Sequence, residues 1–123
     1  LQAAVLAFAG TWAALAAGPL LWSPSRFEKA ALGTRLATTV PAATPVLAWG
    51  VTPNVFIYYG HRPIPVVDGA SAIAQALRDA PHGRVIVLLP EDWRPQLPSA
   101  AIEEFGRVDD DGHGIAAVIV TRS

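Results

Sequence analysis

The sequence predicts a small three-layer α/β sandwich with a mostly parallel sheet and a C-terminal β-hairpin, preceded by one transmembrane helix. Short apolar runs alternate with segments of helical periodicity, a pattern typical of β-α-β units. Residues 1–25 carry no charged side chain. The 123 residues suffice for one hydrophobic core and are too few for two. We therefore divide the chain into a transmembrane helix over residues 1–22 and one α/β domain over residues 23–123.

The composition excludes several classes of protein. Hydrophobic residues make up 52% of the chain and charged residues 15%, against about 25% charged in ordinary soluble domains, which excludes a disordered chain. A net charge of −1 provides no basic surface for nucleic acid. The absence of cysteine excludes a disulfide scaffold, a thiolate metal site and a cysteine nucleophile. Because methionine is also absent and the chain begins at Leu1, we expect a fragment of a longer protein.

The first 22 residues are almost wholly apolar. Their polar groups are Gln2, Thr11 and the indole nitrogens of Trp12 and Trp22. As a helix they are roughly 33 Å long, enough to cross a hydrocarbon core of about 30 Å, and Trp22 is suited to the membrane interface. Two alternatives remain open, a truncated secretory signal peptide with small residues at 14–16 and a helix buried in a soluble core.

The first elements of the domain have recognisable ends. Ser25 and Glu28 have the spacing of a capping box, so we expect a helix over residues 26–38. Prolines then lead into a short apolar run at residues 46–49, which predicts a buried strand. A second helix is expected over residues 53–59, with Thr52 as its N-cap and Gly60 as its left-handed stop.

The second half continues the alternation. Strand 64–67 precedes a helix over residues 71–80 capped by Ser71. Residues 85–89 are apolar without alternation, which is typical of a central parallel strand covered on both faces. A last helix is expected over residues 99–105. Strands at 107–108 and 115–121 then form a hairpin around the polar turn 109–114.

The acidic turn is the first candidate for chemistry. The acidic cluster Asp109 to Asp111, together with His113, offers oxygen and nitrogen ligands for a divalent cation. The alternative is a hairpin turn, which requires Asp and Gly for its backbone conformation, and we favour it. The sequence contains no Gly-x-Ser-x-Gly motif. We therefore expect no catalytic residue, no metal and no cofactor in this chain.

The second candidate is the segment 58–63, which reads Tyr-Tyr-Gly-His-Arg-Pro. It places phenol, imidazole and guanidinium groups at one helix end, where an anionic headgroup or a sugar could bind. We take Tyr59 and Arg62 as candidate substrate-binding residues. In the alternative interpretation the tyrosines pack the helix on the sheet and Arg62 is a surface charge.

Residues 53–66 read Pro-Asn-Val-Phe-Ile-Tyr-Tyr-Gly-His-Arg-Pro-Ile-Pro-Val. Together with the preceding Trp49-Gly50 and the Val-rich run at 85–89, this segment resembles the C-terminal region of bacterial membrane glycosyltransferases related to aminoarabinose transferases and protein O-mannosyltransferases. The resemblance covers residues 45–90 in detail and the rest of the chain in layout only.

The resemblance implies a function and a location. Such enzymes transfer a sugar from a polyprenyl-phosphate donor to a lipid or protein acceptor, with catalytic carboxylates in a membrane domain outside this chain. Residues 23–123 would be a non-catalytic cap on the extracytoplasmic side of the bacterial inner membrane, with the lipid bilayer as a partner. The positive-inside rule argues mildly against an extracytoplasmic location, because the basic residues Arg26, Lys29 and Arg35 follow the apolar segment. The alternative is a membrane-anchored or exported, non-enzymatic α/β binding domain.

Overall fold

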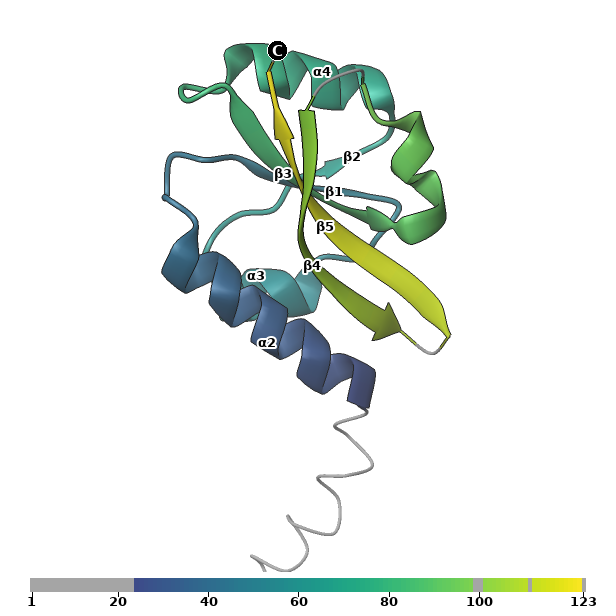
Figure 1. Ribbon diagram of the computed structural model, residues 1–123. Helices are drawn as coiled ribbons and strands as arrows, with labels where there is room; N and C mark the ends of the chain where they lie inside the picture. The colour runs from purple at the N-terminus through teal and green to yellow at the C-terminus, as the bar shows by residue number, and fades with distance from the viewer. Residues whose placement is uncertain (1–23, 99–100, 111, 123) are drawn as a thin grey trace, which may run out of the picture.

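The computed structural model describes residues 24–98, 101–110 and 112–122 (Figure 1). The elements in chain order are α2 (Pro24–Thr39), β1 (Val46–Trp49), α3 (Asn54–Gly60), β2 (Val66–Val67), α4 (Ala70–Asp79), β3 (Arg84–Pro90), the 3-10 helix η1 (Glu91–Gln96), β4 (Ala101–Asp110) and β5 (His113–Thr121). The predicted transmembrane helix over residues 1–22 lies outside the described residues and stays a prediction. Within the described ranges, no helix combines the length and apolar character needed to cross a bilayer.

The five strands form one mixed sheet in the order β2-β1-β3-β5-β4. Strand β1 runs parallel to both β2 and β3, whereas β5 runs antiparallel to both β3 and β4. The expectation of a mostly parallel sheet is therefore wrong. The interior of β3 is continuously apolar because both its faces are covered, and this burial does not depend on the direction of the neighbouring strand.

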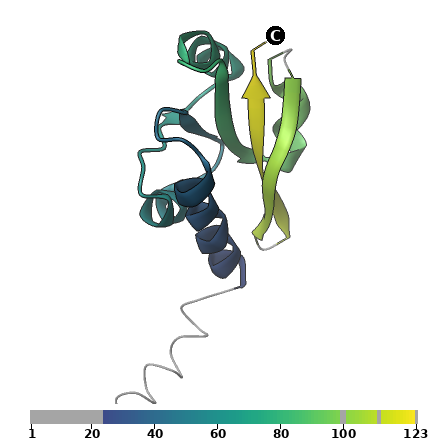
Figure 2. The ribbon, with the colours of Figure 1, turned by 60° about the vertical axis from the view of Figure 1, so that its left-hand side comes forward.

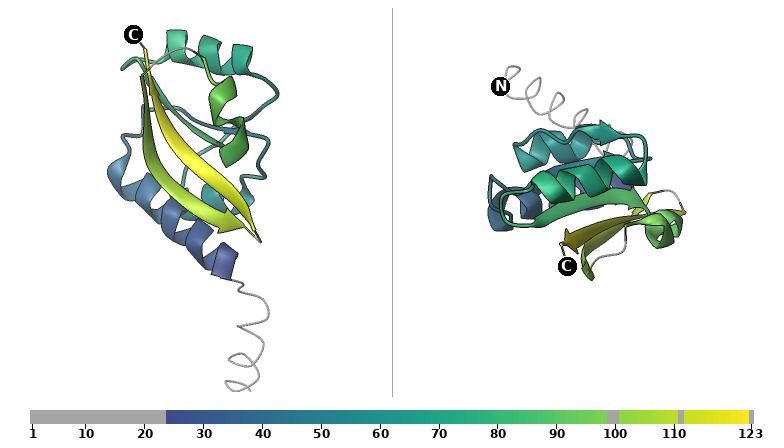
Figure 3. Two further views of the ribbon diagram at one scale, coloured as in Figure 1. Left: turned by 45° about the vertical axis from the view of Figure 1, so that its right-hand side comes forward. Right: turned by 90° about the horizontal axis from the view of Figure 1, so that it is seen from above.

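Helices cover both faces of the sheet. Alternate residues of one strand enter different cores, as Ile86 and Leu88 pack with α2 and α3 while Val85 and Val87 pack with α4. Figures 1 and 2 show α2 and α3 side by side on one face, with α4 on the other. The left view of Figure 3 shows the long β4–β5 hairpin running along the sheet to the beginning of α2.

The segment expected as the last helix is a strand. Residues 99–100 lie outside the described residues, and Ala101–Asp110 pairs with β5 from Ala101 opposite Thr121 to Asp110 opposite His113. Alanine and glutamate favour a helix at residues 101–104, but pairing along β5 outweighs that intrinsic preference. A bulge between Glu104 and Gly106 shifts the pairing register of β4. Leu32 of α2 packs against Gly106 at this bulge. The expected hairpin is confirmed and is longer than predicted.

The other expected elements are confirmed, with small shifts at their ends. Strand β2 is shorter than the predicted 64–67. Helix α4 has Gly69, not Ser71, at its N-cap, and α3 has Pro53 rather than Thr52, in both cases without a side-chain cap. Ser25 is not the N-cap of α2, because the helix already begins at Pro24. The Glu28 carboxylate accepts a hydrogen bond from the Asp109 backbone N–H at 3.1 Å, so it bonds to the hairpin.

The left-handed stop of α3 is His61, with φ 52°, and not Gly60 as predicted. The backbone N–H of His61 donates to the carbonyl oxygen of Ile57. Gly60 has a different role, because a Cβ atom there would lie 3.4 Å from the carbonyl oxygen of Gly33. A Cβ atom at Gly33 would lie only 2.9 Å from the Cβ atom of Tyr59. The two glycines allow α2 and α3 to cross closely.

Candidate functional site

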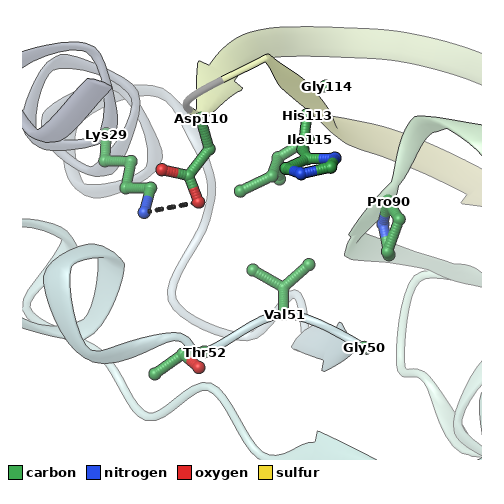
Figure 4. Close-up of a pocket in the computed structure, with 9 residues that line it drawn as sticks. All are labelled: Lys29, Gly50, Val51, Thr52, Pro90, Asp110, His113, Gly114 and Ile115. Atoms are coloured by element: carbon green, nitrogen blue, oxygen red, sulfur yellow. Dashed lines mark ion pairs between the residues drawn. The ribbon is translucent and has the colours of Figure 1, made fainter. Parts of the chain in front are cut away.

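A cavity of about 400 Å³ lies at the carboxyl ends of β1 and β3 (Figure 4). The chain leaves β1 through α3 to reach β2 on one side, and reaches β3 on the other side through α4. Strand order therefore reverses between β1 and β3, and open α/β sheets bind their ligands in the crevice at such a reversal. Nine residues line the cavity: Lys29, Gly50, Val51, Thr52, Pro90, Asp110, His113, Gly114 and Ile115.

One wall of the cavity is an ion pair between a helix and the hairpin. Lys29 Nζ of α2 lies 3.1 Å from Asp110 Oδ2 at the end of β4, and these side chains are 18% and 33% exposed. The hydrogen bond from the Asp109 N–H to Glu28 joins the same two elements. The end of β4 is thus fixed to the first turns of α2 by two polar contacts.

The opposite wall follows directly after β1. In Figure 4 the methyl groups of Val51 point across the cavity towards Asp110, His113 and Ile115. Thr52 and His113 are exposed at the rim. Within the described part of the chain, neither the Thr52 hydroxyl nor the His113 imidazole makes a hydrogen bond to another side chain or to the backbone. Both groups are available to a ligand in the cavity.

An ion pair lies behind the rim. Arg107 Nε donates to Glu91 Oε1 at 3.0 Å, and the other carboxylate oxygen of Glu91 lies against Gly114, where a Cβ atom would collide with it. The hydrogen bond from Arg107 lowers the pKa of Glu91 below its ordinary value of 4.5. The same pair raises the pKa of Arg107. Glu91 and Arg107 therefore form a compensated pair of charges beside the cavity at neutral pH.

The described residues of the acidic turn connect β4 and β5. The Asp109 carboxylate accepts a hydrogen bond from the Gly112 N–H at 3.1 Å, and Gly112 has φ 87°, a conformation that favours glycine. Asp111 lies outside the described residues. Among the residues that are described, no group of three His, Cys, Asp or Glu side chains is placed to hold a metal ion.

Arg62 does not face the cavity. Its guanidinium donates to three backbone carbonyl oxygens of the loop between α2 and β1, those of Val40 at 2.7 Å, Thr44 at 3.3 Å and Pro41 at 3.4 Å. This loop leads into the amino end of β1, whereas the cavity lies beyond its carboxyl end. Arg62 thus holds the loop in place, which neither sequence interpretation anticipated.

Tyr59 belongs to a different surface. Its ring packs edge to face on Tyr58 with centroids 4.9 Å apart, and it lines a shallow apolar groove together with Phe27 and Ala31 of α2. Phe27 is 68% exposed and Tyr58 is 72% exposed. We call Phe27, Tyr58 and Tyr59 the aromatic patch. Tyr59 and Arg62 thus have different neighbours, and both remain candidate contact residues.

The cavity residues were not recognised as a group from sequence. Val51 and Thr52 come directly after a predicted buried strand, and the rule that ligands bind beyond the carboxyl ends of strands could have drawn attention to them. Lys29 and Asp110 could not have been paired, because they are far apart in the chain and meet only through the hairpin. No family model, curated protein or solved structure matches this chain.

Proposed function

We propose that the described domain is the non-catalytic, extracytoplasmic cap of a membrane glycosyltransferase that uses a polyprenyl-phosphate sugar, and that the aromatic patch holds it against the membrane or the membrane domain. The observation that supports the proposal is the position of the patch. Phe27 comes five residues after Trp22, the last residue of the apolar stretch. Five residues span at most about 18 Å even when fully extended, so a membrane helix over residues 1–22 keeps Phe27 near the interface.

The aromatic patch has the chemistry of an interfacial surface. Tyrosine is enriched where membrane and water meet, because its ring is apolar and its hydroxyl is polar. Phe27 and Tyr58 are the two most exposed large hydrophobic side chains of the described residues. The groove between Phe27 and Tyr59 joins α2 to α3 on this surface. An exposed apolar area of this kind marks an interaction site.

Two of the basic residues after the apolar stretch are used inside the domain. Lys29 pairs with Asp110. Arg35 donates to the carbonyl oxygen of Phe105 at 2.9 Å, with its guanidinium carbon 4.5 Å from the centroid of that ring. These contacts give both residues a structural role next to the apolar stretch. Their presence therefore weighs less against an extracytoplasmic domain than the positive-inside rule suggests.

The location is tested by cysteine labelling. The chain has no cysteine, so Ser71→Cys at an exposed position of α4 introduces a single thiol into this part of the protein. In intact bacteria that express the full-length protein with its other cysteines replaced, we expect a membrane-impermeant maleimide to label this thiol. Labelling only after the inner membrane is permeabilised would contradict the extracytoplasmic location.

The activity is tested in the same full-length protein, by transfer of sugar from a polyprenyl-phosphate donor in isolated membranes. We expect transfer, and we expect Phe27→Ser with Tyr58→Ser to reduce it while the protein level in the membrane is unchanged. The matched control is Thr38→Ser with Gln75→Ser, two exposed positions away from the patch. Absence of transfer by the unsubstituted protein would contradict the proposal.

The cavity at the reversal of strand order supports a second candidate, a membrane-anchored or exported α/β binding domain without enzymatic activity. This candidate predicts ligand binding by the chain and no sugar transfer by the full-length protein. The transfer assay therefore distinguishes the two functions.

A further inference from the structure

We propose that the cavity between the end of β1 and the tip of the β4–β5 hairpin binds a small neutral, polyhydroxylated ligand of the monosaccharide class. The proposal stands on the cavity alone and does not depend on the transferase function, in which the sugar donor is handled by a membrane domain outside this chain. It assigns a binding role to a domain that would otherwise be only a cap.

The size and position of the cavity fit a small molecule. Its volume of about 400 Å³ falls within the roughly 300–1,000 Å³ of small-molecule sites. It lies at the reversal of strand order, where α/β sheets bind ligands. The chain builds its walls from four separate segments, the first turns of α2, the residues after β1, the end of β3 and the hairpin.

The charges at the cavity favour a neutral ligand. Lys29 and Asp110 carry opposite charges and pair with one another, so neither presents an uncompensated charge. A further carboxylate, that of Glu28, stands close to the walls and is bound to the hairpin backbone, whereas Glu91 is compensated by its pair with Arg107. The Glu28 carboxylate disfavours an anion such as phosphate. A cation would compete with the Lys29 ammonium for Asp110.

The hydrogen-bonding groups suit hydroxyls. A carboxylate accepts several hydrogen bonds and an ammonium group donates three, so both members of the Lys29–Asp110 pair keep bonding capacity beyond their mutual contact. The Thr52 hydroxyl both donates and accepts, and His113 adds a further polar group at the rim. Donors and acceptors are thus interleaved around one space, as a ligand with several hydroxyl groups requires.

The apolar lining residues of the cavity suit the C–H faces of a sugar ring. Val51, Pro90 and Ile115 offer carbon surface between the polar groups, and a sugar ring has C–H faces between its hydroxyls. Because the end of β4 is held to α2 by the Lys29–Asp110 pair and the Glu28 hydrogen bond, the cavity is formed before a ligand arrives. Preorganised walls reduce the entropy lost on binding.

The test is an NMR titration of the whole 123-residue chain in lauryldimethylamine oxide micelles, since detergents with sugar headgroups would compete. The probes are D-glucose, D-mannose and myo-inositol. We expect at least one to cause saturable shifts of the Gly50, Val51 and Gly114 amides, with a Kd on the order of millimolar. The amides of α4 should not shift.

Two variants assign the binding to the cavity. Asp110→Asn should weaken the binding about tenfold by removing a charged acceptor. Because Asp110→Asn also breaks the pair with Lys29, Thr52→Val provides a second variant that leaves the pair intact and should also weaken binding. The control is Asp79→Asn on α4, whose carboxylate accepts only from Gln75 among the described residues; its Kd should match that of the unsubstituted chain.

Three outcomes would overturn the proposal. The first is no saturable shift with any probe up to about 100 mM, far above the expected Kd. The second is binding of inorganic phosphate at these amides that becomes tighter in Asp110→Asn, which would show an anion site. The third is binding of calcium ions that displaces Lys29 from Asp110. None of these results affects the cysteine-labelling and transfer experiments, so the two proposals fail separately.

Discussion

Arg62 Nη2 donates a 2.7 Å hydrogen bond to the carbonyl oxygen of Val40, a residue 22 positions earlier in the chain. The other terminal nitrogen reaches the carbonyl oxygens of Thr44 and Pro41. One side chain thus bridges the segment after α3 and the loop that joins α2 to β1. Arg62 is therefore a structural clamp. It also lines a separate pocket of about 200 Å³, so its role as a ligand contact stays a prediction. The ability of a guanidinium to donate several hydrogen bonds at once suits both roles.

Replacement of Arg62 should destabilise the domain. Hydrogen bonds from charged groups contribute about 1.5–3 kcal/mol, and Arg62→Ala leaves three carbonyl oxygens to be hydrated instead. We expect the free energy of unfolding to fall by about 1–3 kcal/mol, measured by thermal unfolding of the full chain followed by circular dichroism. The control is Arg78→Ala, an exposed arginine that bonds only Gln75 through its side chain among the described residues. Equal melting temperatures for the two variants would show that Arg62 is not a clamp.

The close crossing of α2 and α3 should make Gly33 intolerant of a side chain. Alanine normally stabilises a helix interior by about 1 kcal/mol relative to glycine, but its Cβ would lie 2.9 Å from the Tyr59 Cβ. We expect Gly33→Ala to cost about 1–3 kcal/mol through overpacking. Gly106→Ala is the comparison, because its closest contact, at 2.7 Å, is the end of the flexible Leu32 side chain. A larger loss of stability for Gly106→Ala would contradict this ranking.

A glycine should be required at position 50, beside the cavity, for the stability of the domain. It has φ 73°, and a Cβ atom there would collide with the ring of Trp93, which packs edge to face on Trp49 with centroids 5.1 Å apart. Left-handed backbone alone costs an ordinary residue about 1–2 kcal/mol. We expect Gly50→Ala to lower the melting temperature and to change tryptophan fluorescence.

The control for Gly50 is Gly69→Ala. Gly69 has extended backbone with φ −175°, and a Cβ atom there meets nothing within 4 Å. We expect this variant to change the free energy of unfolding by less than about 0.5 kcal/mol, as for most surface substitutions. If both glycines tolerate alanine equally, the assigned backbone at Gly50 is wrong.

The Glu91–Arg107 pair predicts a dependence of stability on pH. Since the hydrogen bond from Arg107 lowers the folded-state pKa of Glu91 below 4.5, its stabilising effect is present above the unfolded-state pKa and is lost as the pH falls through the folded-state value. Glu91→Gln should therefore lower the melting temperature at about pH 7 and have little effect at about pH 2.5. The pair is exposed, so the effect is small and is reduced by salt.

Calorimetry at both pH values checks this prediction. The control is Glu103→Gln, because Glu103 is also exposed on β4 and makes no ion pair with the described residues. A difference between Glu91→Gln and the unsubstituted chain that is the same at both pH values would contradict the assigned pairing.

The local elements were largely predictable from their apolar patterns, whereas the residues that cap their ends were not. The strand at 46–49 was predicted from its apolar run and the prolines before it, and Val46–Trp49 is β1. Helix α4 was predicted from the spacing of Ile73 and Leu77, both of which are buried. In contrast, the segment at 101–105 has a composition that favours a helix and forms a strand, because its partner β5 supplies the backbone hydrogen bonds.

The sequence by itself determined most of the helices and strands and the hairpin turn, because these follow from apolar periodicity and from the backbone preferences of proline, glycine and aspartate. Only the tertiary structure decided the mixed order of the sheet, the different neighbours of Tyr59 and Arg62 and the meeting of Lys29 with Asp110 at the cavity. The reason is physical. Strand direction and long-range pairs depend on which segments bury one another, and spacing along the chain does not encode that choice.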